Sequence, residues 1–343
     1  MSGTIRFRWA CRSTAALACL TWTCPHGVAQ SPDPRLDELL STAAVIVRTA
    51  PALAQVWDGF WPPDRPFILA DSAHLALLYT TGPPPAGFEP VQIGTDVPGP
   101  PGITYLHPGR VAGSSASLGL MDLHFAIPGG EAVAVQVQGG VAGTLRFLYH
   151  ESFHAYQDSA FTNPMARDIE VAVAEVTDSA FTALWDVERA ILREALAADD
   201  AGEMRDLLRT YLGVRTLRAQ GVRAPVAAYE DALERIEGSA EWVGWMSVLM
   251  ATDGNVDRLR SQLRTDLRRS RRTPRYAPGG HWVIRMRVYA TGAALCALLE
   301  TLEPDWRNQV AAGQTLVAVA TEAVGVRALD DAGIAAVRAR FGS

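Results

Sequence analysis

The sequence predicts an α+β fold, in which a small, mostly antiparallel β-sheet region is followed by a predominantly helical domain. Short apolar runs bounded by proline or glycine occur before residue 140, and long segments with helical spacing of apolar residues follow from Thr144 onward. Strands that precede helices are typical of α+β rather than doubly wound proteins. The expected strands are 67–70, 75–81, 88–93, 103–107 and 132–138. The expected helices are 144–161, 167–198, 202–219, 224–252, 254–270, 281–302 and 330–340.

The chain divides into three parts on this pattern. Residues 1–29 are expected to be a signal peptide, and residues 30–140 form an N-terminal strand-rich region. A leading helix over 36–53, ending near Pro51, opens that region. Residues 141–343 form the helical domain.

The first 29 residues have the features of a cleaved secretory leader. Three arginines precede a short apolar run from Thr14 to Trp22, and a small residue, Ala29, ends the segment. The apolar run is too short for a permanent membrane span. Lipidation would need Cys19 or Cys24, but neither follows a Leu-small-small sequence. We therefore expect a secreted or periplasmic protein without a permanent span, and a lipoprotein is the less favoured alternative.

Charge and cysteine content exclude two classes of protein. The formal net charge is −6, and the leader contains three arginines and no acidic residue, so the mature chain carries −9. Such an acidic chain is not expected to bind nucleic acid. Removal of the leader leaves Cys296 as the only cysteine, so no disulfide can form within the mature chain.

The segment around residue 150 contains the pattern His-Glu-x-x-His, as His150, Glu151 and His154. Residues four apart lie one turn above each other on a helix, so both imidazoles can occupy adjacent corners of a zinc tetrahedron. Glu151 lies beside them and can reach a water molecule in an open coordination position. A helix with Thr144 as its N-cap would bury one stripe and leave these three residues facing a cleft.

A third protein ligand is expected to be a carboxylate. A zinc ion held by two histidines needs one more protein ligand to leave a position for water, and no further histidine follows at short spacing. Two glutamates are candidates. Glu237 lies in Glu-Gly-Ser-Ala on a later predicted helix, 83 residues after His154, and Glu175 lies only 21 residues after His154.

These motifs resemble the gluzincin metallopeptidases, whose active site is thermolysin-like. The resemblance covers His150–His154 and Glu237–Glu241. It implies a zincin-like catalytic domain with one Zn²⁺ per chain, held by His150, His154 and Glu237, and Glu151 as the general base. It favours Glu237 over Glu175, and implies that Glu241 orients a ligand histidine. Small residues after Glu237 would let its helix pack closely on the metal helix.

A donor for the oxyanion of the attacked carbonyl is expected on the predicted helix over 281–302. Tyr-x-x-Gly resembles the helix that carries a catalytic tyrosine in several gluzincins, which makes Tyr289 the first candidate and His281 the second; Arg285 lies between them. The alternative is that Tyr289 is a core residue. The eight arginines from Arg258 to Arg275 predict a solvated helix face, or a wall that holds substrate carboxylates.

The sequence therefore predicts a secreted zinc-dependent metallohydrolase, a peptidase acting on a peptide or protein substrate. Two alternatives stay open. One is a catalytically inactive zincin-like binding or scaffold protein, which the intact Glu151 disfavours. The other is a zinc hydrolase of non-peptide amides or esters, which would share the same site.

Overall fold

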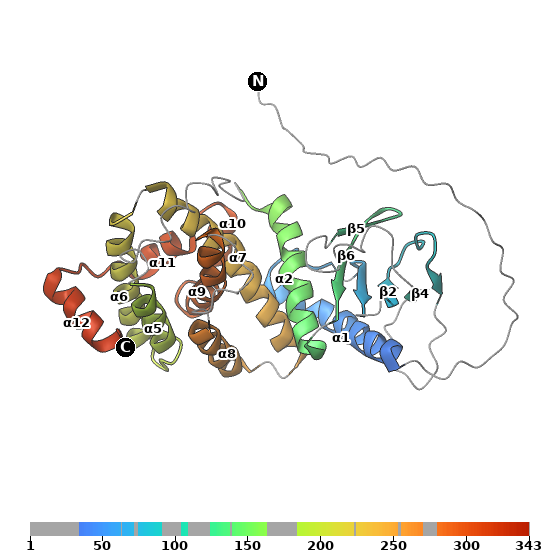
Figure 1. The fold of residues 1–343 in the computed structure, drawn as a ribbon, viewed down its shortest axis with the longest axis horizontal. Coiled ribbons are helices and arrows are strands. Elements are labelled where there is room, and N and C mark those ends of the chain that lie inside the picture. Colours follow the sequence, from blue (N-terminus) through green and yellow to red (C-terminus); the bar gives the residue numbers. More distant parts are fainter. Residues whose placement is uncertain are drawn as a thin grey trace, which may run out of the picture. The chain divides into compact units, whose positions relative to one another are not determined.

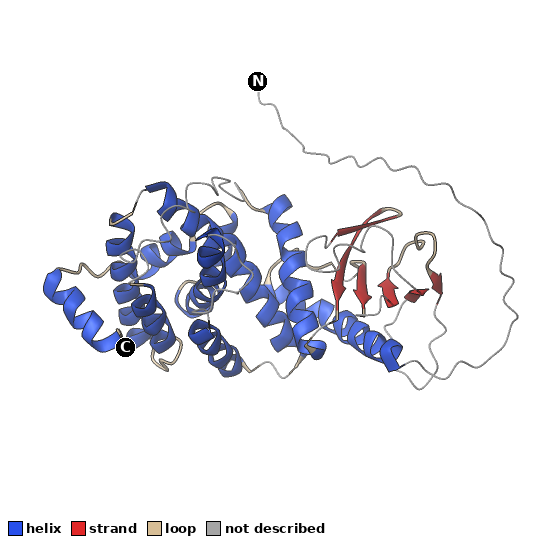
Figure 2. Cartoon of the chain, in the orientation of Figure 1, coloured by secondary structure: helices blue, strands red, loops and turns tan. Residues whose placement is uncertain are grey.

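The computed structural model describes residues 34–342, apart from 63, 72–74, 91–103, 109–123, 138, 163–183, 223, 253–254 and 270–279. The predicted leader lies outside the described residues. The described part is a mixed α+β structure that is mostly helical, with the strands grouped in one region (Figures 1 and 2). The predicted fold class is confirmed at this level. Residues 34–343 group into one compact unit.

The strands form one sheet in the order β3-β4-β2-β1-β6-β5. Every pairing is antiparallel except the parallel pairing of β1 with β6, so the expectation of a mostly antiparallel sheet is confirmed. The edge strand β5, which pairs with β6 alone, was not predicted. The strands are β1 (Phe67–Ala70), β2 (Leu75–Tyr79), β3 (Glu89–Pro90), β4 (Thr104–Pro108), β5 (His124–Ile127) and β6 (Gly130–Gln136).

Helix α1 (Pro34–Val56) joins the sheet to the helical part of the molecule. Alternate strand residues such as Leu69 and Val135 point into the same core cluster as the buried side of α1. The predicted end near Pro51 is wrong. Proline removes only one backbone donor, and the burial of Leu53 and Val56 keeps the last turn in the core.

Part of α1, Leu36–Val56, is long and apolar enough to cross a membrane. Within this structure Ile46 and Leu53 of that segment are fully buried against the rest of the protein, as the apolar side of a core helix is.

The remaining helices follow the predicted segments closely. Residues 167–183 of one predicted helix lie outside the described part of the chain, and two short helices near the C-terminus, α10 and α11, were not predicted. The helices are α2 (Gly140–Ala160), α5 (Trp185–Ala195), α6 (Ala201–Gln220), α7 (Ala224–Ala251), α8 (Val256–Arg269), α9 (Gly280–Leu302), α10 (Trp306–Ala311), α11 (Leu316–Val324) and α12 (Asp331–Phe341).

Helix α7 is the centre of the helical part and packs on α1, α2 and α9. Two glycines allow its closest approaches. A Cβ on Gly238 would lie 2.4 Å from the Cα of Gly292 in α9, and a Cβ on Gly244 would lie 2.6 Å from the carbonyl oxygen of Arg146 in α2. The expected role of Gly238 is thus corrected: it permits contact of α7 with α9, whereas Gly244 permits the contact of α7 with α2.

One face of α7 carries four buried glutamates, Glu230, Glu234, Glu237 and Glu241, which we call the glutamate stripe. Their spacing of four, three and four residues places them on one side of the helix. Burying four carboxylates is costly unless each has compensating partners. The stripe therefore determines which side chains must surround α7.

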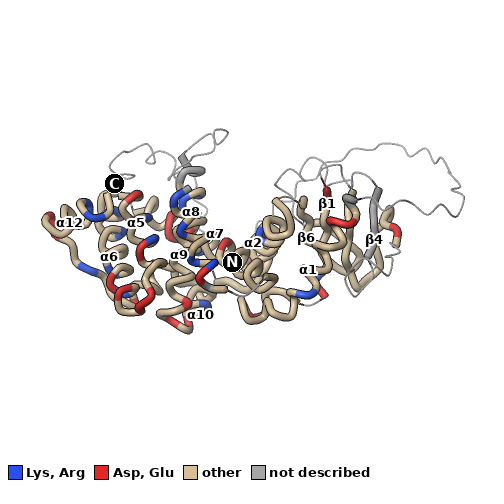
Figure 3. The backbone as a smooth tube through the Cα atoms, turned by 90° about the horizontal axis from the view of Figure 1, so that it is seen from below, with Lys and Arg blue, Asp and Glu red and all other residues tan. Residues whose placement is uncertain are grey.

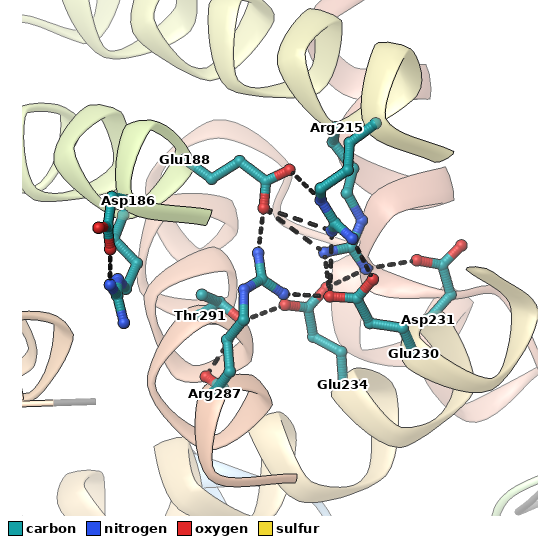
Figure 4. A network of polar contacts seen from close by, with 10 residues as sticks. Asp186, Glu188, Arg215, Glu230, Asp231, Glu234, Arg287 and Thr291 are labelled. Carbon is teal, nitrogen blue, oxygen red and sulfur yellow. Dashed lines mark hydrogen bonds and ion pairs between the residues drawn. The ribbon is translucent and has the colours of Figure 1, made fainter. Parts of the chain in front are cut away.

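Arginines compensate the first half of the glutamate stripe (Figure 4). Arg218 of α6 donates to Glu188 of α5 at 2.7 Å and to Glu230 at 2.8 Å. Arg287 of α9 forms ion pairs with the same two glutamates, and Thr291 donates to Glu234. Four helices thus meet around buried charges, so removing one arginine would leave the buried carboxylates only partly compensated.

We predict that replacing Gly238 with alanine lowers the free energy of unfolding by about 3 kcal/mol, since the new methyl group collides with backbone rather than with a movable side chain. Chemical denaturation would measure the change. Gly130→Ala is the matched control, because a Cβ there meets no atom within 4 Å. Equal stability of the two variants would contradict the close α7–α9 contact.

We predict that Arg218→Met destabilises the protein by about 3–5 kcal/mol, because Glu188 and Glu230 lose a buried counter-charge. Arg205→Met changes an exposed arginine on the same helix and should alter stability by at most about 0.5 kcal/mol. Denaturant midpoints of the two variants would test this. Arg215 of α6 also donates to Glu230, at 3.0 Å, so a small effect of Arg218→Met would show that Arg215 and Arg287 suffice.

Candidate metal centre

Helix α2 presents the two histidines. It starts at Gly140, after Gly139 in the left-handed conformation with φ of 67°. Thr144 is therefore not the N-cap; it lies in the second turn, and its hydroxyl donates to the carbonyl of Gly140 at 3.0 Å. The apolar stripe predicted for α2 is buried from Leu145 to Phe153.

Three ligand-type atoms converge between α2 and α7. The Nε2 atoms of His150 and His154 lie 3.2 Å apart. The Oε2 atom of Glu237 lies 3.5 Å from the first and 3.3 Å from the second. The structure thus brings together His150, His154 and Glu237, while Glu175 lies outside the described residues.

The carboxylate oxygen in this triangle is an orphaned buried atom. Glu237 Oε2 is inaccessible to solvent and forms no hydrogen bond within the described part of the chain. Its neighbours are two imidazole nitrogens, and neutral imidazole and carboxylate are ligands that zinc prefers. The donor set therefore fits a divalent metal ion.

The second ring nitrogen of His154 has a hydrogen-bond partner that fixes the ring. His154 Nδ1 lies 2.8 Å from Gln157 Oε1, and the amide nitrogen of Gln157 donates to the carbonyl of Ile236 and to Ser239 on α7. Because that amide nitrogen faces a carbonyl acceptor, its oxygen must face His154. His154 then carries its proton on Nδ1 and leaves Nε2 free.

Glu241 supports His150 from the opposite side. Its Oε2 lies 3.3 Å from His150 Nδ1, at ion-pair distance without hydrogen-bond alignment. Its Oε1 accepts from Arg146 at 3.0 Å and from Trp245 at 3.0 Å. Glu241 thus lies beside the ring that the sequence predicted it to orient, and their contact is an ion pair rather than a hydrogen bond. Sequence reasoning missed Arg146 and Trp245, which hold Glu241 in place.

Charge and burial shift the titration of the cluster. Burial alone would lower the pKa of His150, but the carboxylates of Glu237 and Glu241 outweigh it and raise this pKa to about 9. Burial alone would raise the pKa of Glu237, yet the two histidines and Arg285 hold it far below its usual range. Glu237 therefore stays ionised, as a metal ligand must.

Glu151 lies at the partly exposed side of the cluster, where its carboxylate and a ring nitrogen of each histidine are all within 4.8 Å of one another. The side chain of His154 is 24% exposed and that of Arg285 is 36% exposed, whereas His150 and Glu237 are almost fully buried. His154 and Arg285 are thus partly exposed, while His150 and Glu237 are shielded.

Helix α9 contributes the oxyanion candidates. The ring of Tyr289 stacks on that of His150 with centroids 5.3 Å apart and planes 12° apart. Arg285 lies 2.5 Å from Glu237 Oε1. Burial first, and then the charge of Glu237, raises the pKa of the Tyr289 hydroxyl, so it remains a neutral donor. His281 lies in the first turn of α9, and its side chain is outside the described residues.

Comparisons with models of protein families, with curated proteins and with solved structures found no match to this chain. The assignment of the centre therefore depends on its own geometry.

We predict opposite pH dependences for stability and for metal affinity. The pKa of His150, about 9 in the metal-free fold, exceeds its ordinary value of 6.5. Stability gained from the protonated ring is complete below pH 6.5 and is lost as the pH rises towards 9. Zinc must displace the same proton, so its affinity should rise about tenfold per pH unit up to about pH 9.

Calorimetric titration with zinc across pH 6.5–9.5, beside denaturation of the metal-free chain, would measure both dependences. An affinity that is independent of pH between 7 and 9 would contradict the assignment of His150 as a ligand.

Proposed function

We propose that this chain is a zinc-dependent hydrolase with a zincin-like site, and that it cleaves peptide bonds. The triangle of ligand atoms carries the proposal. Zinc at about 2.0–2.1 Å from each ligand of a tetrahedral site separates the ligand atoms by about 3.3 Å. The edges between His150, His154 and Glu237 are 3.2, 3.3 and 3.5 Å. One zinc ion per chain therefore fits these side chains without rearrangement.

The chain's own residues supply the acid–base chemistry. A bound zinc ion would lower the pKa of water and polarise a substrate carbonyl. Glu151 would accept a proton from the attacking water on its carboxylate and pass it to the leaving nitrogen. Its partly exposed position beside the two histidines supports this role.

Helix α9 would stabilise the developing oxyanion. The hydroxyl of Tyr289 keeps its proton because its pKa is raised, and Arg285 holds a positive charge at the exposed side of the cluster. Tyr289 is the first candidate donor because its ring stacks on a ligand histidine. His281 remains the second candidate from the sequence pattern.

The leader and the charge of the chain complete the proposal. Residues 1–29 would direct the enzyme to a secreted or periplasmic location, and the acidic mature chain would act on peptides rather than on nucleic acid.

A catalytically inactive binding or scaffold protein is the second candidate, and a specific observation favours it. His150 with a raised pKa can pair with Glu237 and Glu241 and neutralise the cluster without metal. This account predicts a stable ion-pair core with no turnover. Glu151 would then have no chemical task.

We predict that Glu151→Gln keeps its zinc content but lowers kcat/KM for peptide hydrolysis by about 10²–10⁴-fold, since the amide cannot accept the proton. Asp158→Asn removes an exposed carboxylate from the same helix and should leave the rate unchanged. Residues 30–343 would be assayed with quenched fluorogenic peptides, and zinc would be counted by elemental analysis.

Small amides and esters would be assayed in parallel. Turnover of these alone would replace the peptidase proposal with a non-peptide hydrolase. A zinc-loaded chain without turnover on any of these substrates would favour the binding or scaffold protein.

A further inference from the structure

A pocket with a volume of about 250 Å³ lies between α5, α8 and α12. It shares no residue with the metal centre. We call it the arginine pocket. Its polar lining is Asp186, Arg189, Arg193 and Arg268, and its apolar lining includes Leu267 and Phe341. Basic residues are visible on α5, α8 and α12 in Figure 3. Three arginines thus line one pocket of a chain whose net charge is negative, which is typical of a site that binds an anion.

Two acidic residues of α5 near this pocket are already paired with arginines. Asp186 pairs with Arg189, and Glu194 pairs with Arg340 of α12. Within the described part of the chain, Arg193 and Arg268 have no acidic partner. The pocket therefore carries uncompensated positive charge.

Two donors behind the pocket are buried without acceptors. The Nε atoms of Arg193 on α5 and Arg264 on α8 are inaccessible and form no hydrogen bond among the described residues. Burial, and then the charges of Arg268 and Arg264, lower the pKa of Arg193. Arginine keeps its proton in proteins, so the repulsion among Arg193, Arg264 and Arg268 destabilises the ligand-free state.

We propose that the arginine pocket binds a small polyvalent oxyanion of the phosphate type, either inorganic phosphate or the phosphate group of a monoester. Guanidinium groups donate paired hydrogen bonds that match phosphate oxygens. The pocket is smaller than the about 300–1,000 Å³ of typical drug-sized ligand sites, which suits a compact anion. Such an anion would bridge Arg193 of α5 and Arg268 of α8, which line the pocket, and offset the repulsion between them.

The position of the arginines on α8 favours a role different from the one that the sequence suggested. One alternative from the sequence was a wall that holds substrate carboxylates at the active site. Arg264 and Arg268 instead face Arg193 on α5, and residues 270–275 of the run lie outside the described residues. The site is thus independent of the proposed hydrolase reaction.

The test is isothermal titration of the zinc-free chain, residues 30–343, with inorganic phosphate, glycerol 1-phosphate and citrate at constant ionic strength. We expect phosphate or the monoester to bind the intact chain and Arg193→Gln/Arg268→Gln to bind it at least about tenfold more weakly. Arg260→Gln removes the same charge from α8 outside the pocket and should bind like the intact chain. The stronger of the two phosphate ligands identifies the source.

Thermal denaturation provides a second readout that does not depend on the affinity. In anion-free buffer the double variant should melt at the same or a higher temperature, because the arginine repulsion is relieved. Phosphate should raise the melting temperature of the intact chain and of Arg260→Gln only. Binding that survives in the double variant, binding of citrate alone, or no binding of any of the three anions would overturn the proposal.

Discussion

Four buried carboxylates on one face of α7 are the constraint on which the rest of the helical structure depends. Each must be compensated, because an isolated buried charge costs more than the fold can supply. Arg218 and Arg287 reach the first half of the stripe from α6 and α9. His150, His154 and Arg146 reach the second half from α2, with Arg285 from α9. The positions of these helices around α7 follow from that requirement.

The two halves of the stripe are compensated by different chemistry. Arginine stays charged at every physiological pH, so the pairs around Glu230 form a permanent structural core. Imidazole can release a proton and accept a metal ion instead, so the pairs around Glu237 could change their occupant, and a divalent ion in place of one proton would raise the local charge by one. One helix thereby connects a rigid scaffold to an adaptable centre. The glycine contact between α7 and α9 brings Tyr289 to the same centre.

Local patterns in the sequence predicted most helices and strands. Most of the features that were not predicted depend on contacts between residues that lie far apart in the sequence. The His-Glu-x-x-His spacing and the apolar stripe were sufficient to predict α2 and the proximity of its histidines. A resemblance suggested Glu237, but nothing local showed that Gly238 would meet Gly292 rather than α2. The end of α1 was misjudged because burial of Val56 outweighs Pro51. The pairing of buried glutamates with arginines could not be predicted from local patterns, because Arg287 lies 99 residues from Glu188.

Elemental analysis of the purified chain would show whether His150, His154 and Glu237 hold one zinc ion. We expect one zinc per chain in the intact protein and in Glu175→Gln, and loss of zinc in Glu237→Gln with the fold retained by circular dichroism. Absence of zinc from the intact chain after zinc is supplied would rule this site out. Loss of zinc in Glu175→Gln, with Glu237→Gln still loaded, would contradict the assigned third ligand.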